Sequence, residues 1–298
     1  MSAGDVFTFI GELLWNRRVE FAYLAGYVVF EFAVRSRAAR RLAMPGYLLD
    51  LLYGAMYRLG IYAVLIDRPI NDRIFAHLSV PVIAGTPVWF RVIVYVLLLD
   101  FVNYWVHRVE HAVPALWAFH QVHHSQEHLS IMATYRNHPL DFWMRGFFAP
   151  ALCMILVGLP PSVWVWLAIL WDVTLNLSHL EVDWTYGPFR WLFVSPVSHA
   201  IHHSVEERHQ QRNFGANLAI WDRLFGTADL GTARPVAVGL PGWTVRESIL
   251  AHFWAPVRRV VRHYRGLPMD ELVALERTDA TMAAPDGSLT PDSPSVRP

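Results

Sequence analysis

Histidine is the residue type in this sequence whose spacing points most directly to chemistry. Twelve of the fifteen histidines lie between His107 and His209. Residues four apart in sequence, or three and four apart, share one side of a helix. Three short boxes have this spacing, and each would present two or three imidazoles together, as helical metal sites do. The boxes consist of His107 and His111; His120, His123 and His124; and His199, His202 and His203.

The number of imidazoles bears on the number of metal ions. One ion takes about four to six protein ligands and must leave room for a substrate. Eight imidazoles exceed that number, so two metals shared among the boxes are the simplest interpretation. A lone buried histidine is usually a hydrogen-bonded core residue, but eight unpaired imidazoles in or near lipid would be costly without a metal. A histidine-rich storage tract does not fit, because apolar and aromatic residues separate the boxes.

Composition restricts the class of protein that positions these boxes. Hydrophobic residues make up 54% of the 298 residues and charged residues only 17%. That is more apolar than is usual for a soluble domain. The formal net charge of zero gives no indication of nucleic acid binding. The single cysteine, Cys153, excludes a disulfide framework within the chain.

Long apolar runs without alternation predict helices rather than strands. Residues 87–106 form the clearest membrane-spanning segment, and residues 21–34 and 47–66 are two earlier apolar stretches. Residues 142–159 and 163–177 are each short for a span and predict a helical hairpin that enters the bilayer and returns. A pair of buried core helices is the alternative for these two runs. The expected fold is an all-α, polytopic membrane helical bundle with a histidine-rich helical cap that holds a dinuclear metal site.

The distribution of arginine predicts the orientation of this bundle. Cytoplasmic loops favour basic residues, which places the arginine cluster at 35–41 inside the cell. The second apolar stretch then crosses to the outside, and the third crosses back so that His107 is inside. The hairpin enters the bilayer and returns to the same inner side. All three boxes are therefore expected to face the cytoplasm of a bacterial inner membrane. Arg17 and Arg18 fall on the less favoured side in this scheme.

Four regions are expected along the chain. Residues 1–89 would form N-terminal membrane helices, and residues 90–228 the catalytic domain. Residues 229–278 would be a peripheral segment with an amphipathic helix around 245–265, which could lie on the membrane surface. Residues 279–298 are rich in Pro, Ser, Asp and Ala and predict a disordered tail. No glycine-rich phosphate loop or dinucleotide fingerprint occurs, so a bound nicotinamide or flavin is not indicated.

The boxes resemble those of a known family. His-x2-His-His occurs twice after a His-x3-His, as in the fatty acid hydroxylase/sterol desaturase superfamily of integral-membrane di-iron enzymes. The residues from His123 to Glu127 are similar to the second box of that family and the residues that trail it. The segment from Asn213 to Thr227, which contains Trp221-Asp-Arg-Leu-Phe-Gly, is similar to the one after the third box in the alkylglycerol monooxygenase branch. The resemblance covers roughly residues 90–228.

The resemblance implies a set of metal ligands and an activity. The eight box histidines would bind two irons, and His179 matches a further histidine that such enzymes place after the hairpin, so it would be a ninth ligand. His138 would contact a ligand without binding metal, or it would have a structural role. His128 and His209 lie outside the strict boxes. The implied activity is dioxygen-dependent hydroxylation or desaturation of a C–H bond in a lipid, such as a sterol or hopanoid, a fatty acyl or an alkyl lipid.

The residues leave part of this chemistry open. Imidazole suits Fe, Zn, Cu and Ni, so only the resemblance indicates iron. Nearby carboxylates are expected to orient the ligand rings through their second nitrogen. The candidates are Glu110, Glu127, Glu181, Glu206 and Asp222. The resemblance implies that the electrons come from a small redox partner, such as a cytochrome, a ferredoxin or a pterin.

Two other classes of protein remain as alternatives. Histidine clusters near membrane spans also serve ion transport, so a non-catalytic membrane metal-binding or transport protein is the second hypothesis. A transporter would place its ligands along a path through the bilayer, whereas these boxes gather at span ends on one side. A soluble zinc hydrolase needs three ligands and an open position, and eight are too many for it.

Overall fold

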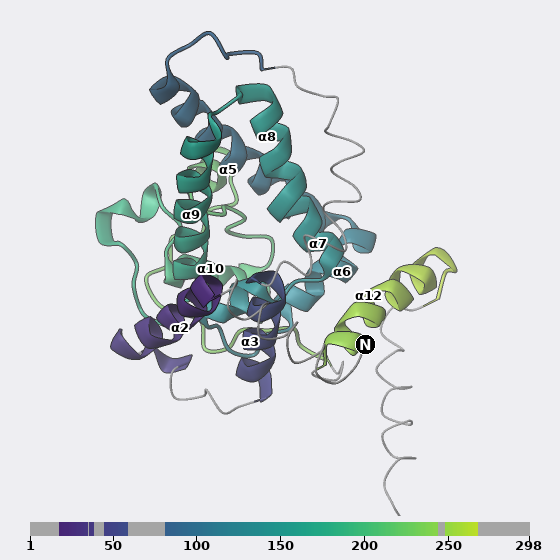
Figure 1. Ribbon diagram of the computed structural model, residues 1–298. Helices are drawn as coiled ribbons and strands as arrows, with labels where there is room; N and C mark the ends of the chain where they lie inside the picture. The colour runs from purple at the N-terminus through teal and green to yellow at the C-terminus, as the bar shows by residue number, and fades with distance from the viewer. Residues whose placement is uncertain (1–17, 35, 39–44, 59–80, 244–247, 268–298) are drawn as a thin grey trace, which may run out of the picture.

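Three helical segments, residues 88–112, 139–157 and 161–178, form a column, and the histidine boxes lie at one end of it (Figure 1). The computed structural model describes residues 18–34, 36–38, 45–58, 81–243 and 248–267. Within these ranges the chain is helical, and its only β structure consists of two isolated bridges, Phe193 with Leu218 and Ser204 with Val238. The all-α prediction is therefore confirmed for the described part of the chain.

The longest helix, α5 (Val88–Ala112), begins after Pro87 and has 25 residues. At 1.5 Å per residue it is about 37 Å long. Its buried stripe runs through Tyr95, Leu99, Asn103 and His107, which is the spacing of one helix face. Its end is set by Pro114, which disfavours helical geometry in Val113 and then occupies the first turn of α6 (Pro114–His124). The first box thus lies on the last turns of α5, and the second box on the last turns of α6.

The predicted hairpin is present as two helices joined by a short turn. Its first arm consists of α7 (Pro139–Trp143), the π-helical turn η4 (Met144–Phe148) and α8 (Ala149–Val157). Gly158 ends α8 in the left-handed conformation, with φ at 66°, and a Cβ there would lie 2.7 Å from Pro81. The second arm is α9 (Pro161–Ser178). Buried residues of α5 and α8 form one apolar core against α9.

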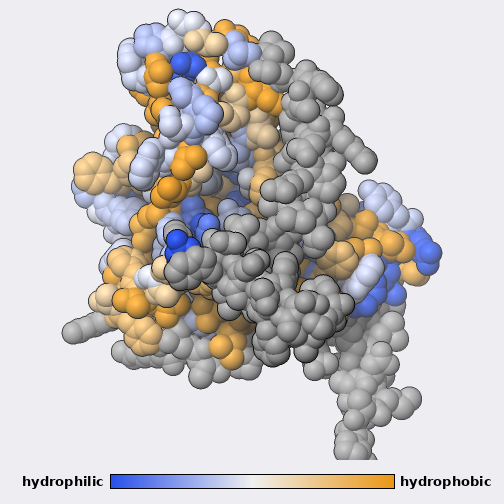
Figure 2. Space-filling model, in the orientation of Figure 1, coloured by the Kyte–Doolittle hydropathy of each residue, from blue (hydrophilic) through white to orange (hydrophobic). Residues whose placement is uncertain are grey.

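Two helices of the column are suited to a bilayer by length and composition. Val88–Ala112 and the continuous helix Pro139–Val157 are long and apolar enough to cross a membrane. In the most apolar stretch of each helix, 28% and 22% of the residues are buried inside the protein, and the rest are partly or fully accessible. Figure 2 shows orange and pale surface along the column of α9 and α8, and hydrophilic surface at the outer end of α12 (Ile249–Tyr264). This exposed apolar surface favours the membrane hairpin over a pair of buried core helices.

The N-terminal helices pack beside the histidine end of the column. Helices α2 (Arg18–Ala33) and α3 (Pro45–Arg58) have 16 and 14 residues, fewer than the ~20 that span a bilayer. They pack on the 3-10 turn η3 (Ile131–Tyr135) through a shared apolar core. The predicted second span at 47–66 lies partly outside the described residues, so the membrane role of residues 1–89 stays a prediction. The tail at 279–298 lies wholly outside them.

The third box follows the hairpin on a short helix, α10 (Pro196–His202). A capping box between Ser195 and Ser198 starts this helix, because each side chain satisfies a backbone amide of the other residue. Helix α12 falls within the predicted amphipathic segment and packs on α6, where Arg259 donates to Gln121 at 2.8 Å. The remaining short elements are η5 (Gly187–Trp191), η6 (Glu207–His209) and α11 (Ile220–Leu224).

Candidate metal centre

The nine predicted ligands lie together in two clusters. In each cluster, one potential ligand atom per residue lies within 4.8 Å of every other. All nine residues are buried except His111, which is half-buried. The first cluster consists of His107, His111, His120, His124 and His202; the second consists of His123, His179, His199 and His203. The first box lies wholly in the first cluster, whereas the second and third boxes are each divided between the two clusters. The spacing of the histidines did not predict this division.

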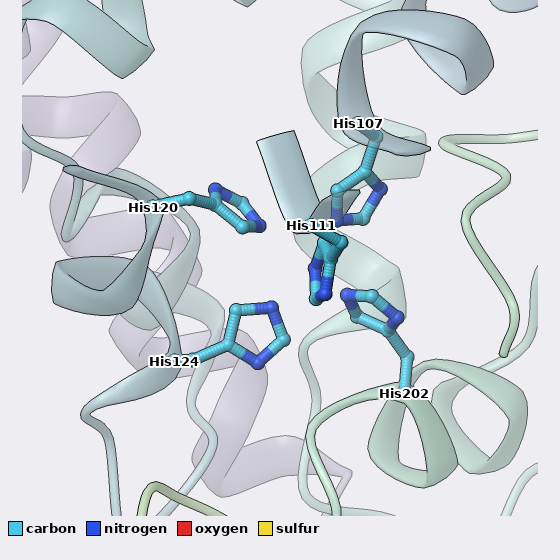
Figure 3. Close-up of side chains that lie close together, drawn as sticks. All are labelled: His107, His111, His120, His124 and His202. Atoms are coloured by element: carbon cyan, nitrogen blue, oxygen red, sulfur yellow. The ribbon is translucent and has the colours of Figure 1, made fainter. Parts of the chain in front are cut away.

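The five rings of the first cluster converge from three helices (Figure 3). Helix α5 supplies two of them, α6 supplies two and α10 supplies one. In all five rings the Nε2 atom is buried and has no hydrogen-bond partner. A buried nitrogen without a hydrogen-bond partner costs free energy. Without a metal, five such nitrogens would face one another with lone pairs that bind nothing. This donor set fits a metal ion.

The second cluster has its Nε2 atoms at the spacing of adjacent metal ligands. The Nε2 of His179 lies 3.3 Å from that of His123 and 2.9 Å from that of His199. The Nε2 atoms of His199 and His203 are 3.1 Å apart. Two imidazole nitrogens at right angles on a metal, each about 2.1 Å from it, are about 3.0 Å apart. The four rings therefore also fit one metal ion.

Backbone carbonyl groups fix the orientation of several rings. The Nδ1–H of His107 donates to the Phe214 carbonyl at 2.8 Å, and that of His202 to the Arg212 carbonyl at 2.7 Å. The Nδ1–H of His179 donates to the Leu175 carbonyl at 3.0 Å. A carbonyl only accepts, so Nδ1 carries the hydrogen and Nε2 keeps its lone pair for a metal. His123 makes the same kind of contact with the Arg136 carbonyl at 3.3 Å.

A carboxylate orients His120 in place of a carbonyl. Its Nδ1–H donates to Asp141 at 3.0 Å, and Glu110 lies 3.8 Å from the same nitrogen. Both carboxylates are buried. Glu110 was among the five candidate carboxylates, whereas Asp141 was missed because no box or motif spacing marks it. It lies in the first turn of α7, at the start of the hairpin, and only the fold brings it to α6.

Asp222 acts on the first cluster through the backbone. Its carboxylate accepts from the amides of Phe214 at 2.7 Å and Gly215 at 2.8 Å, and Phe214 in turn carries the carbonyl that holds His107. Only glycine fits at 215, because a Cβ would lie 2.5 Å from the Leu218 carbonyl oxygen. The segment from Asn213 to Thr227 is thus a support for the first box. The candidates Glu127, Glu181 and Glu206 lie outside the groups of potential ligands.

Burial keeps the rings in the form that binds metal. Desolvation lowers the pKa of His179 to about 3, and that of His202 also to about 3. It lowers the pKa values of His199 and His203 well below the ordinary value, helped by neighbouring histidines. These four rings are therefore neutral at pH 7, and a neutral imidazole is the species that ligates.

The other histidines have separate surroundings. His138 caps α7 by accepting from the Leu140 amide at 3.1 Å, and its ring stacks on Phe253. This is the structural position expected for it. His209 lies beside Glu206 at 4.0 Å, and His252 contacts the Tyr53 hydroxyl at 3.2 Å. None of these three, nor the exposed His128, joins either cluster.

Two cavities reach the clusters. One, of about 420 Å³, runs between α5, η4, α8 and α9 and reaches His123 and His179. It is mostly apolar, with Leu99, Met154 and Leu167 in its wall. The other, of about 580 Å³, reaches His111, His124 and His202 beneath α12 and contains more polar groups, such as Gln121. Both volumes are within the usual range for ligand pockets.

The part of the chain that carries both clusters is similar to proteins of a known family. Residues 92–227 match the fatty acid hydroxylase family. The chain is 33% identical over 204 residues to an ornithine lipid hydroxylase of Rhizobium tropici, a match that covers 66% of this chain and 60% of that protein. It is 33% identical over 132 residues to human alkylglycerol monooxygenase, which covers 43% of this chain and 28% of that protein. The match therefore spans less than two thirds of either relative. No solved structure matches the chain.

Proposed function

Residues 92–227 belong to the fatty acid hydroxylase family, and from this premise we propose that the protein is a membrane-bound, dioxygen-dependent lipid hydroxylase with two irons. One observation supports the proposal more than any other. Nine histidines from distant parts of the chain, eight buried and one half-buried, bring their Nε2 atoms together in two clusters. The Rhizobium and human relatives are named a hydroxylase and a monooxygenase of lipids, and these names favour hydroxylation over desaturation.

The five-histidine cluster would hold one iron and the four-histidine cluster the other. When bound, two ferrous ions supply the reduction of dioxygen to an oxidant strong enough to break an unactivated C–H bond. In the overall reaction, one lipid C–H bond, one dioxygen molecule, two electrons and two protons give one C–OH group and one water molecule. The electrons would come from a small redox partner, namely a cytochrome, a ferredoxin or a pterin.

The residues of the chain have distinct tasks in this reaction. Carbonyl groups and Asp141 hold the rings so that their Nε2 atoms converge. The cavity of about 420 Å³ would receive the lipid beside the second cluster, with its aliphatic and aromatic wall excluding water from the reacting carbon. Exclusion of water also protects a reactive oxidant from side reactions.

The arrangement suits a substrate that stays in the bilayer. Helix α9 exposes Val165, Trp166, Ile169 and Leu170, and α5 exposes Trp89, Ile93 and Leu97. These side chains would face lipid tails, while the clusters lie at the end of the column, near the membrane surface. A lipid could reach the cavity without leaving the membrane. We place that surface on the cytoplasmic side of the bacterial inner membrane, from the arginine distribution.

Growth under ¹⁸O₂ tests the proposed reaction. Cells that express the wild-type chain should contain hydroxylated lipids with one ¹⁸O atom, detected by mass spectrometry. Cells that express His202→Ala at the same level should not, because the first cluster would lack a ligand. An unchanged lipid profile, together with metal uptake by protein-containing vesicles without oxygen consumption, would instead identify a metal transport protein.

A further inference from the structure

The apolar cavity has a polar end, and that end is the one near the clusters. Thr134, Asn137, Asp141 and Arg145 contribute to its wall close to His123 and His179. Tyr95, Met154 and Trp164 contribute to the wall at the other end of the helices. Trp164 precedes His179 by 15 residues along α9, which corresponds to about 22 Å. The cavity therefore has a polar end beside the second cluster and an apolar end deep in the column.

Among the described residues that line this cavity, Arg145 is the one arginine or lysine. It belongs to the π-helical turn η4, and its side chain is only 16% exposed. Its nearest carboxylate oxygen, Oε2 of Glu110, is 4.0 Å from Nε, which is beyond hydrogen-bond distance. Among the described residues its guanidinium makes no hydrogen bond. A guanidinium has five N–H donors, so that of Arg145 can donate to an acceptor inside the cavity.

Two other arginines of the same region, buried Arg136 and half-buried Arg58, donate hydrogen bonds to acceptors within the protein. Arg136 donates to Asp50 at 2.6 Å and to the Gly46 carbonyl at 2.7 Å. Arg58 donates to Asp172 and to the Tyr135 hydroxyl. The fold therefore gives hydrogen-bond acceptors to both of these guanidinium groups, whereas that of Arg145 has only its 4.0 Å ion pair with Glu110 and lines the cavity. Short π-helical turns inside α-helices are also frequent at functional sites.

From this geometry we infer that the substrate is a lipid with an oxyanion, a carboxylate or a phosphate, at its polar end, and that Arg145 binds this oxyanion. The inference rests on the proposed function and adds the substrate class to it. A planar guanidinium matches either oxyanion with two parallel hydrogen bonds. The chain of the lipid would extend toward Tyr95 and Trp164, away from the clusters.

The position of the hydroxyl group follows from this binding mode. Arg145 follows Asp141 by four residues, one helical turn, and Asp141 contacts the His120 ring. A polar end held by Arg145 therefore presents its neighbouring carbon atoms to the clusters. The far end of the chain would lie about 20 Å away, beyond reach of the reaction. Hydroxylation is thus expected on carbons next to the polar end of the lipid.

Binding of three lipids with the same chain tests this inference. The full-length protein in phosphatidylcholine nanodiscs would be titrated with radiolabelled palmitate, hexadecyl phosphate and hexadecanol. The wild type should bind at least one of the two anions about tenfold more tightly than the alcohol, and the comparison of palmitate with hexadecyl phosphate identifies which oxyanion is preferred. Arg145→Gln should abolish this preference, and Arg145→Lys should restore part of it, since lysine keeps the charge without the planar fork. Arg190→Gln, outside the cavity, is the matched control.

The outcomes separate the inference from the proposed function. Equal binding of the three lipids by the wild type would overturn the inference even if Arg145→Gln failed to fold. Turnover of a neutral lipid, with the hydroxyl group far from the polar end, would also overturn it while leaving the proposed function standing. Preferential binding of an anion that depends on Arg145, without any hydroxylated product, would support the oxyanion site and contradict the hydroxylase.

Discussion

The orientation of each imidazole decides whether these histidines can bind metal. Five of the nine rings donate Nδ1–H to an oxygen atom that the fold holds in place, and this contact directs Nε2 inward. Four of these oxygens belong to backbone carbonyl groups, which no sequence motif identifies. The candidate metal ligands could therefore be identified from the spacing of the histidines, but the oxygen atoms that orient their rings could not.

Asp141→Asn tests the one support that is a side chain. The amide keeps the shape of the carboxylate but removes its charge, so it holds the His120 ring less firmly. Loss of such a partner typically costs about 10- to 100-fold in metal affinity or activity. We expect that reduction in iron affinity, measured by competition with a chelator. Glu127→Gln, a change at an exposed carboxylate, is the control and should leave iron affinity unchanged.

His179→Ala tests the ligand that lies outside the three boxes. The substitution removes one of four Nε2 atoms from the second cluster, so the protein should lose about one iron and its activity. Iron content and oxygen-dependent turnover are the measurements, with exposed His263→Ala as the control. Normal iron content with only partly reduced turnover would place His179 outside the ligand set.

At the scale of elements, the N-terminal helices support the second cluster through a buried polar network. Glu31 of α2 accepts from the Ile131 amide at 2.8 Å, and Asp50 of α3 accepts from Arg136 at 2.6 Å. The Arg136 carbonyl then receives the His123 ring. These contacts connect residues outside the matched region 92–227 to a predicted ligand. They explain why α2 and α3 carry buried acidic residues within apolar sequence.

Asp50→Ala should therefore damage the second cluster from a distance. It leaves the Arg136 guanidinium buried without its carboxylate, and breaking a buried ion pair in this way costs about 3–5 kcal/mol. We expect a lower unfolding temperature in detergent and loss of iron from the second cluster before the first. The control is Asp183→Ala, which removes an exposed ion pair with Arg37. Equal effects of the two substitutions would contradict the supporting role of α3.

The elements themselves were predicted unevenly. The hairpin was predictable because two apolar runs flank consecutive prolines, and α5 because it is continuous and apolar. The continuation of α5 through the first box, the π-helical turn and the packing of α2 on η3 were not predicted. The packing of α2 on η3 depends on contacts between residues about 100 positions apart, such as Glu31 with Ile131, and local periodicity does not contain such contacts.

At the scale of the whole molecule, the column separates two ends. Residues 81–87, just before α5, lie at one end and the histidine helices α6 and α10 at the other (Figure 1). Cysteine substitutions test the predicted orientation: Gly85→Cys and Glu127→Cys are both at exposed positions, and the native Cys153 is buried. In intact cells a membrane-impermeant maleimide should label the cysteine at 85 but not the one at 127. Labelling of 127 alone would reverse the orientation, and labelling of both would contradict a bilayer between them.

The central claim is that two clusters of histidines hold two irons, and the iron content of the purified protein tests it most directly. The protein would be reconstituted anaerobically with ferrous iron in detergent, desalted and analysed for metal and protein. About two irons per chain are expected, falling to about one in both His202→Ala and His199→Ala, because each variant removes a ligand from a different cluster. Less than about one iron per wild-type chain, or retention of iron and oxygen-dependent turnover in both His202→Ala and His123→Ala, would contradict it.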